Sequence, residues 1–230
     1  MYIYIYLQYL KIVYLCRIMG KINQGILGGI SGKVGPVVGG SWKGINYVRS
    51  MPTSVSNPNT VPQQNQRAKF KGAVSMAQAL LGAIVQVFWN PIASGMSGFN
   101  RFLSKNVDFF SAAGVLDYPN ALPMTGTLLP APITSLVADA SLNTVVAGYT
   151  NNGGVGNALG TDTMALIVYN ETQEYWKSVT TGSLRSTGTV SLADDLMQIG
   201  DIVHGYLCVY RTGNFSLASI PAYLTTNVVP

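Results

Sequence analysis

The sequence predicts an α+β fold with an extended glycine-rich N-terminal arm, a two-helix middle segment and a C-terminal immunoglobulin- or fibronectin-like β-sandwich. Three observations predict it: glycine is dense over residues 20–50, apolar residues recur every three or four positions over residues 61–113, and short β-rich runs alternate with turn residues thereafter. The expected segments are a leader (1–18), a basic arm and linker (19–59), a helical segment (60–118) and a sandwich domain (119–230).

The first eighteen residues are apolar and rich in Tyr and Ile. A signal peptide has a basic start, an uninterrupted apolar centre and a small-residue cleavage site, whereas Gln8 and Lys11 interrupt this run. A spanning helix requires about 20 apolar residues. We therefore expect translation to begin at Met19, leaving residues 1–18 outside the fold. Membrane binding is expected only if these residues are a genuine part of the protein, and no compartment follows from the sequence.

The arm holds nine glycines between Gly20 and Ser50, too many for a stable helix. Glycine permits positive φ and close backbone approach, and the pairs Ile26-Leu27 and Val37-Val38 are typical of brief strands. We expect an extended arm with tight turns that lies against another surface.

Within the arm, residues 28–33 (GGISGK) resemble a phosphate-binding loop but lack its spacing. Leu27 stands where the loop requires its first Gly, and Val34 stands where it requires a hydroxyl residue. Pro36 would also fall in the first turns of the required helix. No nucleotide and no other cofactor is expected.

Charge is divided unequally along the chain. Residues 1–107 hold 11 basic and no acidic residues, and residues 108–230 hold 3 basic and 9 acidic ones, so the two parts carry +11 and −6. This pattern favours an arm and a body with different partners. We expect self-association, in which the arm meets the acidic body of a neighbouring copy, over nucleic-acid binding through the same arm. The candidate partner-binding residues are Lys33, Trp42, Lys43, Tyr47, Arg49, Arg67, Lys69 and Lys71.

The arm sequence GKINQGILGGISGKVGPVVGGSWKGINYVRS, followed by NPNTVPQQNQRAKF, resembles the opening of an uncharacterised domain-of-unknown-function family common in Bacteroidota. The resemblance continues through SGFNRFLSKN, GVGNALGTDTMALIVYN and GDIVHGYLCVY, and so covers nearly all of residues 19–230. It implies a start at Met19 and carries no known activity.

Two helices are expected in the middle segment. Thr60 is the predicted N-cap of a helix from Val61 to about Trp89, with Gln63 as its capping-box partner and Pro91 as its stop. Its apolar stripe comprises Phe70, Val74, Ala77, Leu81, Ile84 and Phe88, while Gly72 and Gly82 weaken it or permit close packing. A second helix is expected over 97–113, with Phe99, Phe102, Leu103, Asn106 and Phe110 along one side.

Six β-rich runs predict the sandwich strands. They are Thr144–Tyr149, Thr163–Tyr169, Tyr175–Thr180, Thr187–Leu192, Val203–Tyr210 and Ala222–Val228. Tyr206 lies two residues before Cys208, a spacing typical of the tyrosine corner of immunoglobulin-type domains.

Residues suited to catalysis are sparse. His204 is the only histidine, and it is expected to be a hydrogen-bonded structural residue. Cys16 and Cys208 form no metal motif, and Cys208 is expected to be a buried hydrophobe. Asp162, Asp194, Asp195 and Asp201 lie in or beside predicted turns, where Asp usually serves local hydrogen bonding.

The sequence therefore favours a non-enzymatic structural or assembly protein, of a virion or of a cell surface, with no small-molecule substrate. A nucleic-acid-binding module is the alternative. A carbohydrate- or surface-binding sandwich, using loops 151–157 and 212–215, is a further alternative.

Overall fold

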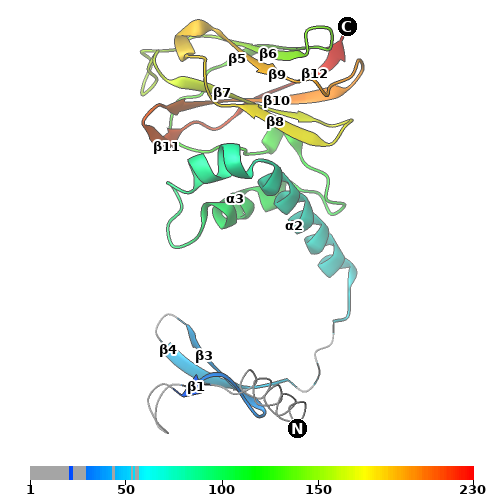
Figure 1. Ribbon diagram of the computed structural model, residues 1–230, viewed down its shortest axis with the longest axis vertical. Helices are drawn as coiled ribbons and strands as arrows, with labels where there is room; N and C mark the ends of the chain where they lie inside the picture. The colour runs from blue at the N-terminus through cyan, green and yellow to red at the C-terminus, as the bar shows by residue number, and fades with distance from the viewer. Residues whose placement is uncertain (1–20, 23–29, 43–44, 53, 55–56) are drawn as a thin grey trace, which may run out of the picture. The chain divides into compact units, whose positions relative to one another are not determined.

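The computed structural model describes residues 21–22, 30–42, 45–52, 54 and 57–230. The expected leader lies outside these residues. The chain divides into two compact units, Met1–Pro58 and Asn59–Pro230 (Figure 1). We describe each unit by itself.

The arm unit contains a small antiparallel sheet with strand order β1-β2-β3-β4. Its strands are β1 (Lys21–Ile22), β2 (Ile30–Val34), β3 (Val37–Trp42) and β4 (Ile45–Ser50). A tight turn at Gly35-Pro36 joins β2 to β3, and Gly35 adopts a φ of +59° there. The described part of the arm is thus paired into hairpins, and the brief strand expected at 26–27 lies outside the described residues.

The second unit begins with helix α2 (Val61–Ala79), which starts where the capping box predicts. Gln63 Oε1 accepts a hydrogen bond of 3.2 Å from the Thr60 N–H. The expectation of one helix to Trp89 is wrong, because α2 ends at Ala79 and a π-helical segment, η1 (Leu81–Trp89), leaves it at 95°. A straight helix of this length would extend about 43 Å. The bend at Leu80 instead places α2 and η1 over one buried apolar cluster.

Among the described residues, no single helix has the length and apolar character of a membrane span. Only α2 and η1 taken together meet those two criteria, and the sharp bend separates them.

Helix α3 (Gly98–Asn106) is capped by Ser97, whose Oγ accepts a hydrogen bond of 3.2 Å from the Asn100 N–H. It ends earlier than the predicted residue 113. The buried Asn106 side chain bonds the chain after the helix, donating to the Leu122 carbonyl at 3.0 Å and accepting from the Leu122 N–H at 2.9 Å. Short 3₁₀ turns η2 (Val107–Phe109) and η3 (Tyr118–Asn120) complete the helical segment.

The remaining residues form two layers of strands. One layer holds β5 (Ile133–Asp139), β6 (Thr144–Tyr149) and β9 (Thr189–Ala193) in the order β5-β6-β9. The other holds β7 (Thr163–Asn170), β8 (Tyr175–Val179), β10 (Ile202–Arg211) and β12 (Ala222–Val229) in the order β8-β7-β10-β12, and β11 (Asn214–Ala218) pairs with β10. A short parallel pairing of β12 with β5 joins the layers.

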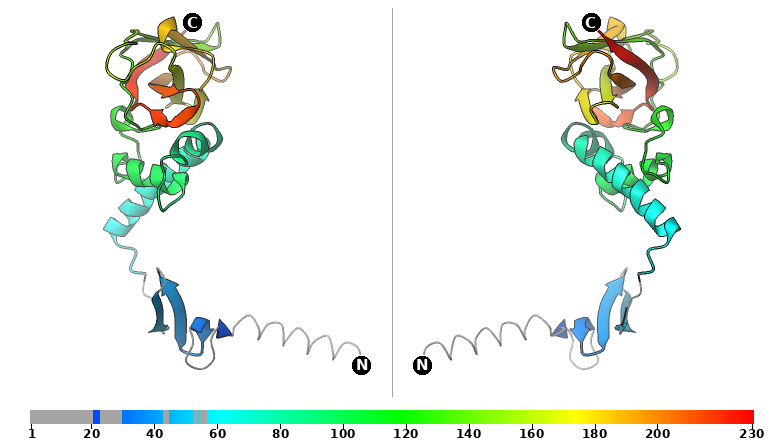
Figure 2. Two further views of the ribbon diagram at one scale, coloured as in Figure 1. Left: turned by 90° about the vertical axis from the view of Figure 1, so that its left-hand side faces the viewer. Right: turned by 90° about the vertical axis from the view of Figure 1, so that its right-hand side faces the viewer.

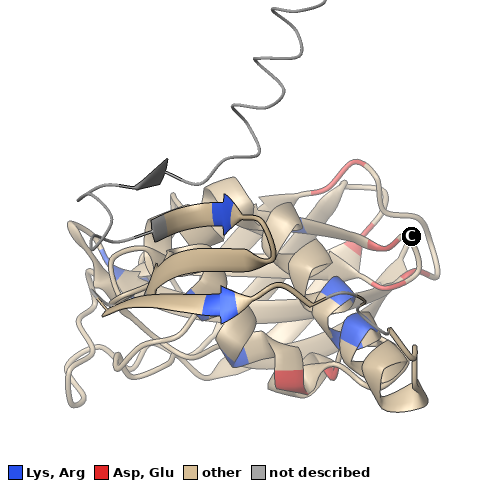
Figure 3. Ribbon diagram, turned by 90° about the horizontal axis from the view of Figure 1, so that it is seen from below, with Lys and Arg blue, Asp and Glu red and all other residues tan. Residues whose placement is uncertain are grey.

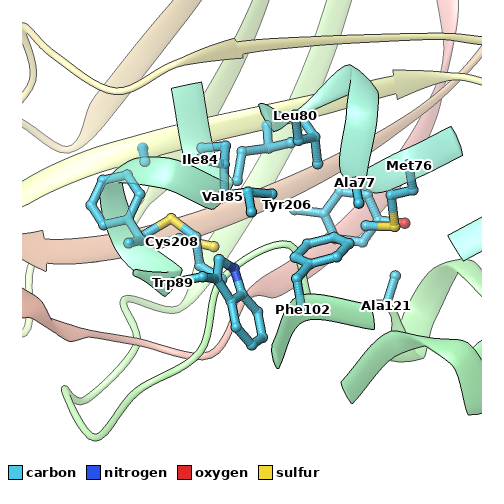
Figure 4. Packing of buried hydrophobic residues seen from close by; sticks show 14 of the residues in the cluster. Met76, Ala77, Leu80, Ile84, Val85, Trp89, Phe102, Ala121, Tyr206 and Cys208 are labelled. Carbon is cyan, nitrogen blue, oxygen red and sulfur yellow. The ribbon is translucent and has the colours of Figure 1, made fainter. Parts of the chain in front are cut away.

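Two cores explain this arrangement. Along β7, Leu166 and Val168 point into the core between the two sheets, whereas Ala165 and Ile167 point into the core beneath the helices. Figure 2 shows, within the second unit, the helices on one side of the strand layers. The β8-β7-β10-β12 sheet is therefore buried on both faces at its centre, which explains the near-continuous apolar runs of β7 and β10. Figure 4 shows the second core, where Tyr206 and Cys208 of β10 lie among Trp89, Phe102 and other helical residues.

The predicted α+β class with an immunoglobulin- or fibronectin-like sandwich is confirmed. All six expected strands are present, one with the expected bounds and the others with boundaries shifted by at most two residues. Strands β5 and β11 were not expected. The prediction of a tyrosine corner is wrong. The Tyr206 hydroxyl donates to the carbonyl of Tyr118 at 2.9 Å, and Tyr118 belongs to the helical segment, 88 positions away.

Candidate functional site

Three of the candidate arm residues share one face of the small sheet. Lys33 pairs with Val38 across β2 and β3, and Val38 pairs with Arg49 across β3 and β4. Directly paired residues point to the same side of a sheet, and so do residues two apart in one strand. Lys33, Arg49 and Tyr47 therefore lie on one face, which we call the basic face. Lys43 lies outside the described residues, and only the backbone of Trp42 is described.

The sheet exposes apolar side chains on both faces. Ile45 and Tyr47 on the basic face are 66% and 46% exposed, and Val48 on the opposite face is 56% exposed. Gly40 lies beneath the Tyr47 ring, because a Cβ added there would lie 3.0 Å from the Tyr47 hydroxyl. The basic face thus offers two cations, an aromatic ring and an aliphatic side chain to a partner.

The basic residues at the start of α2 divide between two sides of the helix. Arg67 and Lys71 line a shallow hollow with Phe70, whereas Lys69 does not. Phe70 was expected in the buried stripe and is instead half exposed, because the buried face of α2 begins only at Ala73. Arg67 also donates to Asn59 Oδ1 at 3.0 Å. Figure 3 marks the basic residues of the arm and of α2 in blue.

A second concave site, which the sequence did not indicate, is a groove of about 550 Å³ in the second unit. We call it the aromatic groove. Helix α2 forms one wall through Ser75 and Met76. Val115 and Tyr118, the first residue of η3, form another, and β7 and β8 contribute the base. The residues from the two strands are Tyr169, Tyr175 and Trp176, and the turn between them contributes Glu174.

The aromatic rings of the groove belong to an array of ring contacts across four strands. Tyr169 pairs with Trp176 on β8 and with His204 on β10. The ring centroids of Tyr169 and Trp176 lie 4.6 Å apart, and Tyr118 stacks on His204 at 3.9 Å. Tyr206 and the partly buried Tyr223 extend the array through a ring contact at 5.5 Å.

His204 is held within this array as the sequence suggests. Its Nδ1 bonds the Tyr223 hydroxyl at 2.8 Å and its Nε2 bonds Glu171 Oε2 at 3.0 Å. Both ring nitrogens are therefore engaged inside the protein, and the imidazole orients Glu171 beside the phenols. The sequence signal for this array is the spacing of His204 and Tyr206. They lie two residues apart on β10 and therefore on the same face of its sheet.

Carboxylates surround the array. Burial raises the pKa of Tyr118, and the negative charge of Glu171 raises it further. The pKa of Tyr169 is raised by burial, then by Glu174 and Glu171. The pKa of Tyr223 is likewise raised by burial and by Glu171 and Asp117. Glu171, Glu174 and Asp117 act on these phenols in the same direction, because a nearby negative charge disfavours the phenolate.

The other aspartates combine the expected local turn contacts with hydrogen bonds to side chains 19 and 31 positions away. Asp194 accepts hydrogen bonds from the Tyr175 hydroxyl at 2.7 Å and the Leu196 N–H at 3.1 Å. Asp201 accepts from Asn170 Nδ2 at 2.8 Å and from the Gln198 N–H at 2.9 Å. Asp162 and its arginine partners are likewise buried or partly buried. Within the described part of the chain no group of three His, Cys, Asp or Glu residues is placed to hold a metal ion.

The loop 151–157, a candidate ligand site in the carbohydrate alternative, is tied to the connector before β5. Asn157 donates to the Thr127 carbonyl at 2.8 Å and accepts from the Leu129 N–H at 2.9 Å. Asn152 donates to the Pro130 carbonyl at 2.9 Å and accepts from Arg185. Two of its polar side chains are thus used to hold the loop itself.

Comparison with known proteins gives a family and a set of similar sandwiches. A family model described as "Family of unknown function (DUF6266)" matches residues 29–219. No curated protein shows significant sequence similarity.

Among solved structures, the fn3 domain of the human collagen alpha-1(XX) chain is 15% identical with a TM-score of 0.32, over 45% of this chain and 90% of that one. A Fn3-like protein from Clostridium thermocellum is 14% identical with a TM-score of 0.28, over 44% and 95%. Scores of this size carry no conclusion about function.

Proposed function

The chain belongs to DUF6266, a family of unknown function, and from this premise we propose that it is a non-enzymatic structural protein whose basic arm packs on a neighbouring subunit. The observation that carries the proposal is the small arm sheet. All six residues of β4 are exposed, although the neighbouring strand β3 is partly buried. A small sheet that covers so little of its surface is only marginally stable in water. A partner surface that covers the arm would supply the missing burial.

Charge favours another copy of the chain as that partner. The basic face holds Lys33 and Arg49, and residues 1–58 include no acidic residue. Residues 108–230 carry −6, with Glu174 and Asp195 among their exposed carboxylates. Complementary charge of this kind orients two copies and raises their association rate.

Edge strands allow the same contact between copies to form through backbone hydrogen bonds. β4 ends the strand order of the arm sheet, and β8 ends the order of the β8-β7-β10-β12 sheet. Each end strand presents unpaired N–H and C=O groups, which a strand from another molecule can bond. A virion or a cell-surface assembly would use such a contact repeatedly.

The environment of the nucleophilic candidates supports a non-enzymatic role. Cys208 is fully buried, and burial raises the pKa of its thiol, so little thiolate forms. Both nitrogens of His204 are engaged.

The proposal is tested by light scattering on full-length chains eluting from a size-exclusion column. Arg49→Glu reverses one charge of the basic face and is expected to reduce the multimer fraction. Lys105→Glu makes the same charge change at an exposed side chain of α3 and is the matched control. If Arg49→Glu and the combined variant Tyr47→Ser/Arg49→Glu assemble as the unaltered chain does, the arm does not mediate self-association.

Nucleic-acid binding is the second candidate, and one observation favours it. Arg67 and Lys71 flank the half-exposed Phe70 in the hollow on α2, an arrangement suited to stacking a base between phosphate contacts. In this case the chain would bind single-stranded DNA with an affinity that falls steeply with salt. Phe70→Ser and Lys71→Glu would weaken that binding, whereas Lys105→Glu would leave it largely unchanged.

A further inference from the structure

The aromatic groove has a chemistry that the basic arm lacks. Its base and one wall are the partly buried rings of Tyr169, Trp176 and Tyr118. A cation held within about 6 Å of such a ring is attracted by the electron-rich face, by about 0.5–2 kcal/mol. Rings fixed by stacking lose little further freedom when a ligand arrives. The groove is therefore already arranged to receive a positively charged group.

The charges at the groove point to the same class of ligand. Glu174 lines it, and Glu171 lies close enough to raise the pKa of Tyr118 and Tyr169. The lining residues, all of them described, include no Lys or Arg. Lys177 follows Trp176 on β8, but it pairs with Asp194 at 3.1 Å and Asp195 at 2.6 Å.

We infer that the aromatic groove is the docking site for the basic face of a second copy, with Arg49 or Lys33 entering among the rings and Tyr47 and Ile45 covering the apolar wall. This inference rests on the proposed self-association and adds its location. The basic face supplies the cations and the apolar area that the groove lacks, and the groove supplies the carboxylates that the arm lacks.

The position of the groove also suits a strand partner. It borders β8, the terminal strand of its sheet. A strand laid beside β8 would run along the groove, so backbone pairing and side-chain docking would occur together. Alternate side chains of β4, Ile45, Tyr47 and Arg49, would then enter on one side.

A photo-crosslinking experiment on the full chain locates the occupant. Val115 lines the groove and is 56% exposed, so a benzophenone amino acid can replace it with little loss of packing. A mixture of ¹⁴N- and ¹⁵N-labelled chains is irradiated, and the crosslinked peptides are identified by mass spectrometry. The same replacement at Leu142, 69% exposed between β5 and β6, is the control.

Crosslinks from Val115 to residues 30–51 of the other isotopic label are expected. Crosslinks to the arm of the same chain would overturn the inference and show that the arm folds back. Crosslinks to another region, or an equal arm yield from Leu142, would also overturn it. So would the absence of crosslinks in a sample that light scattering shows to be multimeric.

A charge exchange tests the aromatic groove as the docking site separately from the proposed self-association. Glu174→Lys is expected to weaken self-association about tenfold, and combining it with Arg49→Glu in one chain is expected to restore most of the loss. Asp108→Lys makes the same charge change on an exposed residue that does not line the groove. If Arg49→Glu disrupts assembly but Glu174→Lys does not, the groove is the wrong site and the arm-mediated assembly remains. If neither has an effect, the proposed function fails as well.

Discussion

The carboxylate of Asp162 lies 3.5 Å from the guanidinium of Arg185, and both side chains are almost completely buried. Arg185 also donates to the Leu129 carbonyl at 2.9 Å and to Asn152 Oδ1, while Arg211 donates to Asp162 Oδ1 at 3.1 Å. Burial lowers the pKa of Arg185, and the charge of Asp162 acts in the opposite direction. This ion pair thus ties the connector before β5, the loop before β7 and strand β10 together.

Replacing Arg185 with Met is expected to lower the free energy of unfolding by about 3–5 kcal/mol, because the buried Asp162 loses its fully buried partner. Urea denaturation followed by circular dichroism measures this. Lys105→Met, at an exposed side chain of α3, is the control and should lie within about 0.5 kcal/mol of the unaltered chain. Equal stability of the two variants would show that the ion pair does not hold the fold.

Two glycines of the helical segment are expected to respond oppositely to alanine. A Cβ at Gly72 would lie 2.6 Å from the Phe110 ring and 2.9 Å from the Gly114 carbonyl oxygen. Gly72→Ala should therefore destabilise the protein by about 1–3 kcal/mol. A Cβ at Gly82 meets nothing within 4 Å, and Gly82→Ala should be stabilising by about 0.5–1 kcal/mol. Thermal melts of both variants test the pair, and a loss of stability in Gly82→Ala would contradict the open space around Gly82.

Local patterns predicted the elements of the second unit well. The spacing of Thr60 and Gln63 located the start of α2, because a capping box needs only neighbouring residues. The near-continuous apolar runs of β7 and β10 likewise indicated strands, and alternate residues of each run face the two cores. Lys33, Tyr47 and Arg49 were proposed from charge and composition, and their common face follows from the strand register.

What the sequence did not indicate depends on contacts between distant segments. The bend at Leu80 follows from packing against the β8-β7-β10-β12 sheet, whose strands lie more than 80 residues further along the chain. The aromatic groove joins α2 and Tyr118 to Trp176, and no local pattern brings these residues together. No local pattern marks Arg185 as buried, because its partners Asp162, Asn152 and the Leu129 carbonyl lie 23 or more positions away.

The buried phenols are expected to destabilise the fold at high pH. Burial is the largest cause of the raised pKa of Tyr118, Tyr169, Tyr175, Tyr206 and Tyr223. An unfolded chain releases these protons near pH 10, while the native state retains them. Stability is therefore full below pH 10 and falls as the pH rises above it. Absorbance at 295 nm and circular dichroism should change together during alkaline titration; early ionisation without unfolding would contradict the burial.

The thiol of Cys208 is expected to report opening of the core between β10 and the helices. It is completely buried, and burial raises its pKa, so a thiol reagent can react only after the helical layer separates from the sheet. The test uses the Cys16→Ser chain, because Cys16 lies outside the described residues. Ellman's reagent should modify Cys208 at a rate that rises with urea in parallel with unfolding. Complete modification within seconds in native buffer would show that this core opens easily. The rate should increase in Gly72→Ala, which strains the contact between α2 and Phe110, and should not increase in Gly82→Ala.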